Sequence, residues 1–179
     1  NGVLVLRAFS EASRALAAGF TTLRDMAGDP DIVFSLRDAI SRGIVPGPRI
    51  VAAGPAIEPT GGGIVRGFRR DVLDLLAERN HLETFCDGPD DCARAAREAI
   101  NNGADFVKVV VTGSILAPNS ARSQQMSTPE LDAIIGAARG MNKKVSAHAH
   151  GLPGINAALS AGVQSIEHGT FGDESSIQL

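Results

Sequence analysis

Several features that mark whole classes of protein are scarce in this sequence. Its 179 residues carry 17 lysines and arginines against 20 aspartates and glutamates, a net charge of −3 that is spread without runs of one sign. Binding nucleic acid or an anionic membrane surface needs clustered basic charge, so we expect neither partner. Apolar stretches are interrupted long before the roughly 20 residues that span a bilayer, so we expect no membrane segment.

Cysteine is equally scarce, with only Cys86 and Cys92 in the chain. Two thiols do not make the disulfide framework of a small secreted protein, and no second Cys or His pair stands at zinc-finger spacing. We therefore expect a reducing compartment and a cytoplasmic protein. The chain starts at Asn1 without an initiator Met and without the basic and apolar regions of a signal peptide, so we expect a fragment of a longer protein.

Apolar periodicity alternates along the chain between the helical and the strand pattern. We expect helices at 3–18, 32–41, 72–78, 89–102, from 127, at 153–160 and from 173, and strands at 20–23, 48–53, 105–111, 144–147 and 163–167. Five strands alternating with helices predict an α/β fold, a parallel sheet with helices on its faces, in one domain over residues 1–179. The irregular stretch 54–87 is long for a connection, which is typical of a functional loop.

A doubly wound open sheet and a (β/α)₈ barrel both fit this alternation. No Gly-x-Gly-x-x-Gly follows a strand, and Gly61-Gly62-Gly63 lacks the Lys-Ser/Thr of a phosphate loop, which argues against nucleotide binding. Polar residues stand in or just after the strands: Arg24 and Asp25, Lys108, His148, and Glu167 with His168. In a barrel the carboxyl ends of the strands form one catalytic mouth, so these side chains would converge there.

Lys108 lies in the middle of an apolar strand, where burial penalises its charge. One interpretation is an ammonium group that reaches solvent or a neighbouring carboxylate. A second is a Schiff-base lysine, and a third is a lysine carbamylated by carbon dioxide that serves as a metal ligand.

The histidines bear on that choice. His148 and His168 close two consecutive strands, so adjacent parallel strands would hold them at the same level, and two imidazoles with a modified lysine suit zinc. His150 would alternate away from His148 if the strand continued, and one interpretation is an exposed loop histidine. His81 is expected at the surface.

Seven strings resemble, in the same order, the amidohydrolases related to imidazolonepropionase and to Xaa-Pro dipeptidases (prolidases). They cover essentially the whole chain: Gly19–Asp25, Gly47–Ile50, Thr60–Gly62, Asp87–Pro89, Gly103–Val109, Ala147–Gly151 and Ser165–Gly169. One departure is Gly63, where many relatives have histidine after two glycines.

This resemblance implies strands two to six of an eight-stranded barrel, with the first and last strands absent. It also implies a binuclear zinc centre bridged by carbamylated Lys108, with His148 and His168 as ligands of one metal. His150 stands at a position that is variable in the family and would face substrate. The family's His-x-His of the first strand and the aspartate of the eighth have no counterpart here. Arg24 and Asp25 would either orient the ligands or form an ion pair at the barrel rim.

The function expected from this resemblance is hydrolysis of an amide or peptide bond by zinc-activated water, in a small molecule or a dipeptide. The alternatives are a Schiff-base lyase or aldolase that uses Lys108, and a noncatalytic fragment. Five strands alone would expose apolar edges, so we expect a longer parent chain or packing against another copy in a homo-oligomer.

Overall fold

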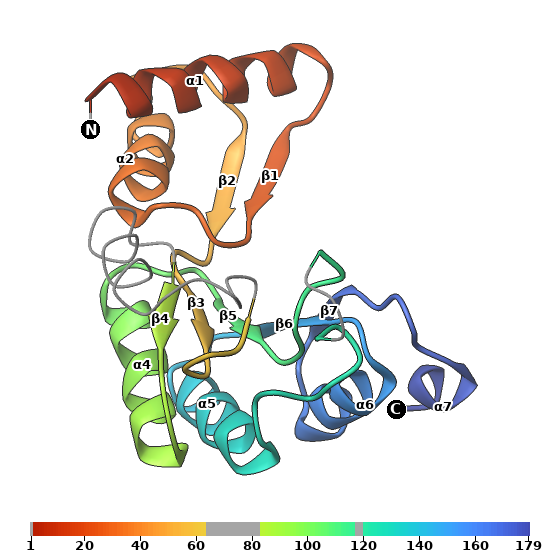
Figure 1. Cartoon of the computed structure of the whole chain (residues 1–179). Helices are drawn as coiled ribbons and strands as arrows, with labels where there is room; N and C mark the ends of the chain where they lie inside the picture. The colour runs from red at the N-terminus through yellow and green to blue at the C-terminus, as the bar shows by residue number, and fades with distance from the viewer. Residues whose placement is uncertain (1, 64–82, 117–119) are drawn as a thin grey trace.

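The computed structural model describes residues 2–63, 83–116 and 120–179, in which helices and strands alternate (Figure 1). The helices are α1 (Gly2–Ala17), α2 (Pro30–Ser41), α4 (Pro89–Asn101), α5 (Thr128–Gly140), α6 (Leu152–Ala161) and α7 (Glu174–Ile177). The strands are β1 (Thr22–Asp25), β2 (Arg49–Ala52), β3 (Ala56–Glu58), β4 (Glu83–Phe85), β5 (Val107–Val110), β6 (Val145–Ala149) and β7 (Ser165–His168).

The elements expected in the described ranges are present, within a few residues at their ends. The helix expected at 72–78 lies outside the described residues. Two short strands, β3 and β4, were not expected and fall in the stretch taken as irregular. No helix in the described ranges has both the length and the apolar character needed to cross a membrane.

The strands form a pair, β1-β2, and a five-stranded sheet in the order β4-β3-β5-β6-β7, with every pairing between them parallel. Gly54, with φ of +68°, bends the chain between β2 and β3. This bend takes one continuous run from pairing with β1 to pairing with β5. The Asp105 amide also donates to the Ala52 carbonyl (2.8 Å), which joins the two sheets.

The row of strands curls back on itself. The Arg24 guanidinium on β1 meets the Glu167 carboxylate on β7, with Nη2 and Oε1 2.5 Å apart. In a flat sheet, β1 and β7 would be four strand spacings apart, about 19 Å, too far for these side chains to meet. The strands are therefore an arc of a (β/α)₈ barrel and not a doubly wound open sheet.

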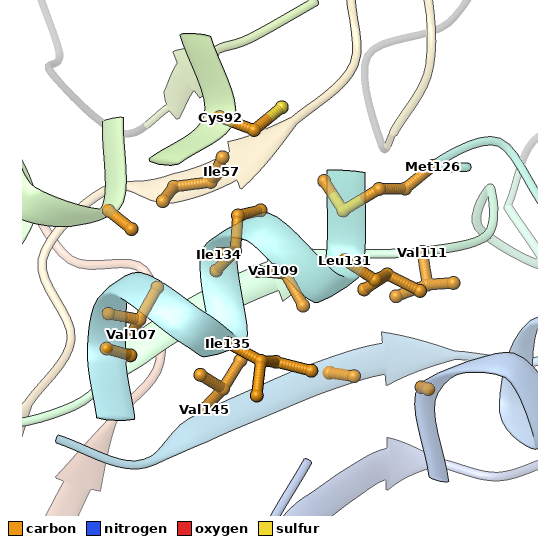
Figure 2. Close-up of a cluster of buried hydrophobic side chains, with 14 of the residues drawn as sticks. Ile57, Cys92, Val107, Val109, Val111, Met126, Leu131, Ile134, Ile135 and Val145 are labelled. Carbon is orange, nitrogen blue, oxygen red and sulfur yellow. The ribbon is translucent and has the colours of Figure 1, made fainter. Parts of the chain in front are cut away.

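The two faces of this arc differ. The outer face packs against helices: Val107, Val109 and Val145 meet Leu131 and Ile134 of α5 in a buried apolar cluster (Figure 2). The inner face carries polar side chains from neighbouring strands: Arg24, Glu58, Lys108, Ser146, His148, Ser165 and Glu167. The residues that bear chemistry are thus brought together inside the curve.

Local sequence explains why α5 begins where it does. Ser127 and Glu130 form a capping box, in which the Ser127 amide donates to Glu130 Oε2 (2.8 Å). The other oxygen of Glu130 accepts from the Gly88 amide (2.8 Å), directly before α4. One carboxylate therefore fixes the start of two adjacent helices.

The structure corrects the expectation for the cysteines. Cys86 and Cys92 form a disulfide that joins the end of β4 to the first turn of α4. Both are buried, and the turn at Gly88 and Pro89 brings their Cα atoms to 4.9 Å. Cysteine usage therefore gives no argument for a reducing or cytoplasmic location.

Candidate metal and catalytic site

Three histidines form the centre of the candidate site. His148 lies in β6, His150 follows that strand, and His168 ends β7. Each offers a ring nitrogen, and these nitrogens all lie within 4.8 Å of one another. The ring centroids are 4.7 Å apart for His148 and His150, and 4.6 Å for His168 with either of the others.

The backbone at His168 makes this convergence possible. His168 pairs in register with Ala149 and not with His148, so regular alternation would place the two histidines on opposite faces. Instead, His168 has φ of +76°, a left-handed conformation that is unfavourable for a residue with a side chain. Such strain is found mainly at functional sites, where the surrounding structure enforces it.

His150 is placed differently from the expectation. It does not turn away from His148, because residues two apart along a strand share a face. It is also buried, so it is no exposed loop residue. Its amide donates to Thr112 Oγ1 (2.9 Å), and its Nδ1 lies 2.7 Å from Thr170 Oγ1, which orients the ring.

Burial keeps two of these imidazoles, those of His148 and His150, uncharged. Burial, with a further contribution from Lys108, lowers the pKa of His148 to about 3. Burial and the neighbouring His168 also lower the pKa of His150. Neutral imidazole is the form that ligates metal ions, so the cluster suits a cation such as zinc.

Lys108 lies on the inner face of β5, in register with Ser146 of β6 and only 6% exposed. Its Nζ donates to the Val109 carbonyl (3.3 Å). Burial lowers its pKa to about 8, although the charge of Glu167 opposes that shift. At neutral pH the uncharged amine is therefore more populated than for an exposed lysine.

Sequence comparison agrees with this geometry. Residues 5–176 match the family model described as "Amidohydrolase family". The chain belongs to the amidohydrolase family. This confirms the resemblance to the amidohydrolases that the seven sequence strings indicated.

Individual relatives of this amidohydrolase chain are longer. The ochratoxinase of Aspergillus niger is 34% identical over 174 residues, which cover 89% of this chain and 35% of that protein. The chain thus spans about a third of the length of the curated relatives that it matches.

Solved structures give the same picture. A Xaa-Pro dipeptidase with methionine bound in its active site superposes with a TM-score of 0.84 at 35% identity, over 97% of this chain and 43% of that one. The A. niger ochratoxinase structure gives 0.84 at 29% identity, over 98% and 41%. A prolidase complexed with N-methylphosphonate-L-proline gives 0.79 at 32% identity, over 98% and 45%. The partial-barrel fold class is confirmed.

Arg24 and Asp25 are placed apart in the amidohydrolase chain. Glu167 accepts from Arg24 and from the hydroxyls of Ser146 (2.8 Å) and Ser165 (3.0 Å). Burial would raise the pKa of Glu167, but these donors lower it overall. Asp25 instead caps the turn before α2, where its Oδ1 accepts from the Gly28 amide (2.7 Å).

Glu58 is the inner-face residue that the sequence reading missed. It ends β3, is fully buried, and contributes to the electrostatics of Lys108. The signal that could have found it is a charged residue at the end of the short apolar run from Ala56, directly before Pro59. His81 lies outside the described residues.

Proposed function

We propose that the parent protein is a metal-dependent hydrolase that cleaves an amide or peptide bond. The observation that carries the proposal is the convergence of three histidines at the end of the inner face that also holds buried Lys108. A dipeptide ending in proline is the first substrate to test, since prolidases are among the similar structures. An acyl-amino acid or a lactam comes next.

The donor set fits a zinc site. His148 and His168 are the proposed ligands, together with Lys108 as its carbamate, and His150 either joins them or contacts substrate. Carbamylation forms a bond between the neutral Lys108 nitrogen and the carbon of carbon dioxide and releases a proton; the buried amine favours this step because its uncharged form is populated. A zinc ion supplies a water of lowered pKa and polarises the substrate carbonyl.

The residues around the ligands position them. Thr170 and Thr112 hold the ring and backbone of His150, and the strained backbone of His168 aims its ring at the cluster. The Arg24, Ser146 and Ser165 side chains hold Glu167 beside Lys108. Arg24 is therefore proposed as a residue that orients the site through Glu167, and Asp25 as one that shapes the adjacent turn. Two zinc ions per chain and a homo-oligomer belong to the same proposal.

The test is Lys108→Ala in the full-length protein, with Lys144→Ala as the matched control because Lys144 is exposed directly before β6. We expect Lys108→Ala to lose zinc and activity together, by more than the roughly 10–100-fold that loss of a residue behind the ligands causes. Short carboxylic acids or carbon dioxide should restore part of the activity. Full zinc content and activity in Lys108→Ala would refute the proposal.

A Schiff-base lyase is the second candidate, because a lysine whose pKa burial lowers to about 8 is also suited to attack a carbonyl. Borohydride with a carbonyl substrate would then trap Lys108 as a stable secondary amine, and mass spectrometry would locate it. Under the hydrolase proposal no such adduct forms. A folded, zinc-loaded protein that turns over no substrate would instead favour a noncatalytic role.

A further inference from the structure

Glu58 is a buried carboxylate for which the proposed chemistry has so far given no task. It is 0% exposed, on the inner face of a sheet whose neighbouring strand carries Lys108. Burying a carboxylate away from water is unfavourable unless its surroundings compensate for the lost hydration. The groups around Glu58 should therefore explain why a carboxylate is buried at this position.

The backbone at Glu58 is fixed on both sides. Its strand, β3, lies between β4 and β5, and the Glu58 carbonyl accepts from the Cys86 amide (3.0 Å). The register pairs Ile57 with Val109. Ile57 and Val109 both face the helices, so Glu58 faces inward, on the same side as Lys108.

The glycine-rich segment leaves room for the Glu58 carboxylate. After β3 the chain folds back, with the Gly62 amide donating to the Pro59 carbonyl (3.0 Å) and the Gly63 amide to Gln125 Oε1 (2.7 Å). A Cβ at residue 63 would lie only 1.4 Å from Glu58 Oε2, and Gly63 has φ of +72°. The carboxylate thus occupies the space that a side chain at position 63 would fill.

We propose that Glu58 is a positioning residue for Lys108: from the adjacent strand, its carboxylate attracts the Lys108 nitrogen and holds it inside the barrel. Glu167 acts on Lys108 from the other side, but its negative charge is also paired with Arg24. Lys108 therefore lies between two carboxylates. Its pKa is lowered mainly by burial, and the charge of Glu58 is among those that oppose this lowering. A lysine carbamate keeps one N–H, so the same acceptor serves both forms of the side chain.

This inference rests on the proposed zinc site, and its test compares Glu58→Met and Glu58→Gln in the full-length zinc protein. Methionine matches the length of glutamate without an acceptor, and glutamine keeps an acceptor without the charge. We expect zinc release to a chelator to be about 10–100-fold faster for Glu58→Met, with Glu58→Gln in between.

The stability of the metal-free protein separates positioning from packing. Removing one partner of a buried charge pair leaves the other charge uncompensated, whereas replacing both partners by apolar groups of similar volume is often neutral or stabilising. The double variant Glu58→Met with Lys108→Met should therefore unfold at the same or a higher denaturant concentration than wild type. The matched control is Ile57→Val, next along the strand but facing the helices, which should unfold at lower denaturant and release zinc at the wild-type rate.

Two results would overturn the inference. One is wild-type zinc release in Glu58→Met while Lys108→Ala loses zinc, which would leave the proposed function intact. The other is faster release that merely parallels lost stability in Glu58→Met and Ile57→Val alike. If Lys108→Ala itself keeps its zinc, the proposed function fails and this inference fails with it.

Discussion

In the central strands β5 and β6, the outer and inner faces are both buried but opposite in chemistry. In β5, Val107 and Val109 are fully buried against the helices, whereas Lys108 between them is 6% exposed on the inner face. In β6, Ala147 faces the helices, whereas Ser146 and His148 face inward. Period-two alternation thus lets each strand present apolar side chains to one layer and polar side chains to the other.

The energetic consequences of these faces differ as well. Burying apolar area stabilises the fold by roughly 25 cal/mol per Å². Burying lysine, histidine and glutamate is unfavourable unless their hydrogen bonds and charges are compensated. The outer face therefore supplies stability, and the inner face uses part of it to hold reactive groups in place.

The comparison predicts that a truncation on the outer face is the most damaging change to stability. Leu131 of α5 is 0% exposed, and it packs in the apolar cluster of the outer face (Figure 2). We expect Leu131→Ala to lower the free energy of unfolding by about 2–5 kcal/mol, because it leaves a cavity. Denaturant unfolding of the metal-free protein measures this loss.

Zinc binding by the folded fraction should not change in Leu131→Ala. Leu131→Met, which nearly conserves volume, is the control and should cost less than about 1.5 kcal/mol. A loss of zinc affinity comparable to the loss of stability would show that the two faces are not independent.

Sequence alone predicted the outer face well. The apolar runs of β5 and β6 and the helix α5 between them follow directly from hydrophobic periodicity. The short strands β3 and β4 were missed because three residues carry no periodic signal, and β3 also lies between Pro55 and Pro59. Their pairing with β5 and with each other, and not their composition, makes them strands.

The inner face was predicted only in part. Lys108, His148 and His168 were identified because reactive residues in apolar strands are conspicuous. The expectation that His150 turns away from His148 or is exposed was wrong, because His150 is buried with its ring beside that of His148. The turn that allows the Cys86–Cys92 bridge depends on backbone geometry. The contact between Arg24 and Glu167 joins residues 143 positions apart, which only the curvature of the sheet brings together.

A smaller loss of stability is expected from changing Glu130, a polar side chain that holds two of the outer helices in place. Glu130 accepts from the amides of Ser127 and Gly88, so it caps α5 and ties it to the start of α4. We expect Glu130→Gln to lower stability by about 1 kcal/mol at pH 7, a typical value for a lost cap. Thermal or denaturant unfolding measures it.

The pH dependence gives Glu130 a distinctive signature. Burial would raise the pKa of Glu130, but its hydrogen bonds from Gly88 and Ser127 lower it overall. A carboxylate whose pKa is lower in the folded state stabilises the fold above its unfolded pKa, about 4.3, and this contribution disappears as the pH falls through the folded pKa. The gap between wild type and Glu130→Gln should therefore close in acid. The control is Glu98→Gln, at an exposed pair with Arg94, which should have little effect on stability at any pH. An equal difference in stability between wild type and Glu130→Gln at neutral and at acidic pH would contradict the capping role.

The smallest effect on stability is expected on the inner face itself, at Arg24. Its ion pair with Glu167 is partly exposed, with side-chain exposures of 45% and 22%, so solvent screens it. We expect Arg24→Met to change the free energy of unfolding by no more than about 1 kcal/mol, and by less at high salt. Unfolding at low and high ionic strength measures this, with Arg14→Met, at the more exposed pair with Glu11, as the control.

Zinc release should nevertheless quicken in Arg24→Met, because Glu167 loses the cation that holds it beside Lys108. A loss of several kcal/mol with unchanged zinc release would mean that Arg24 ties β1 to β7 for stability, and the division between the two faces would no longer hold.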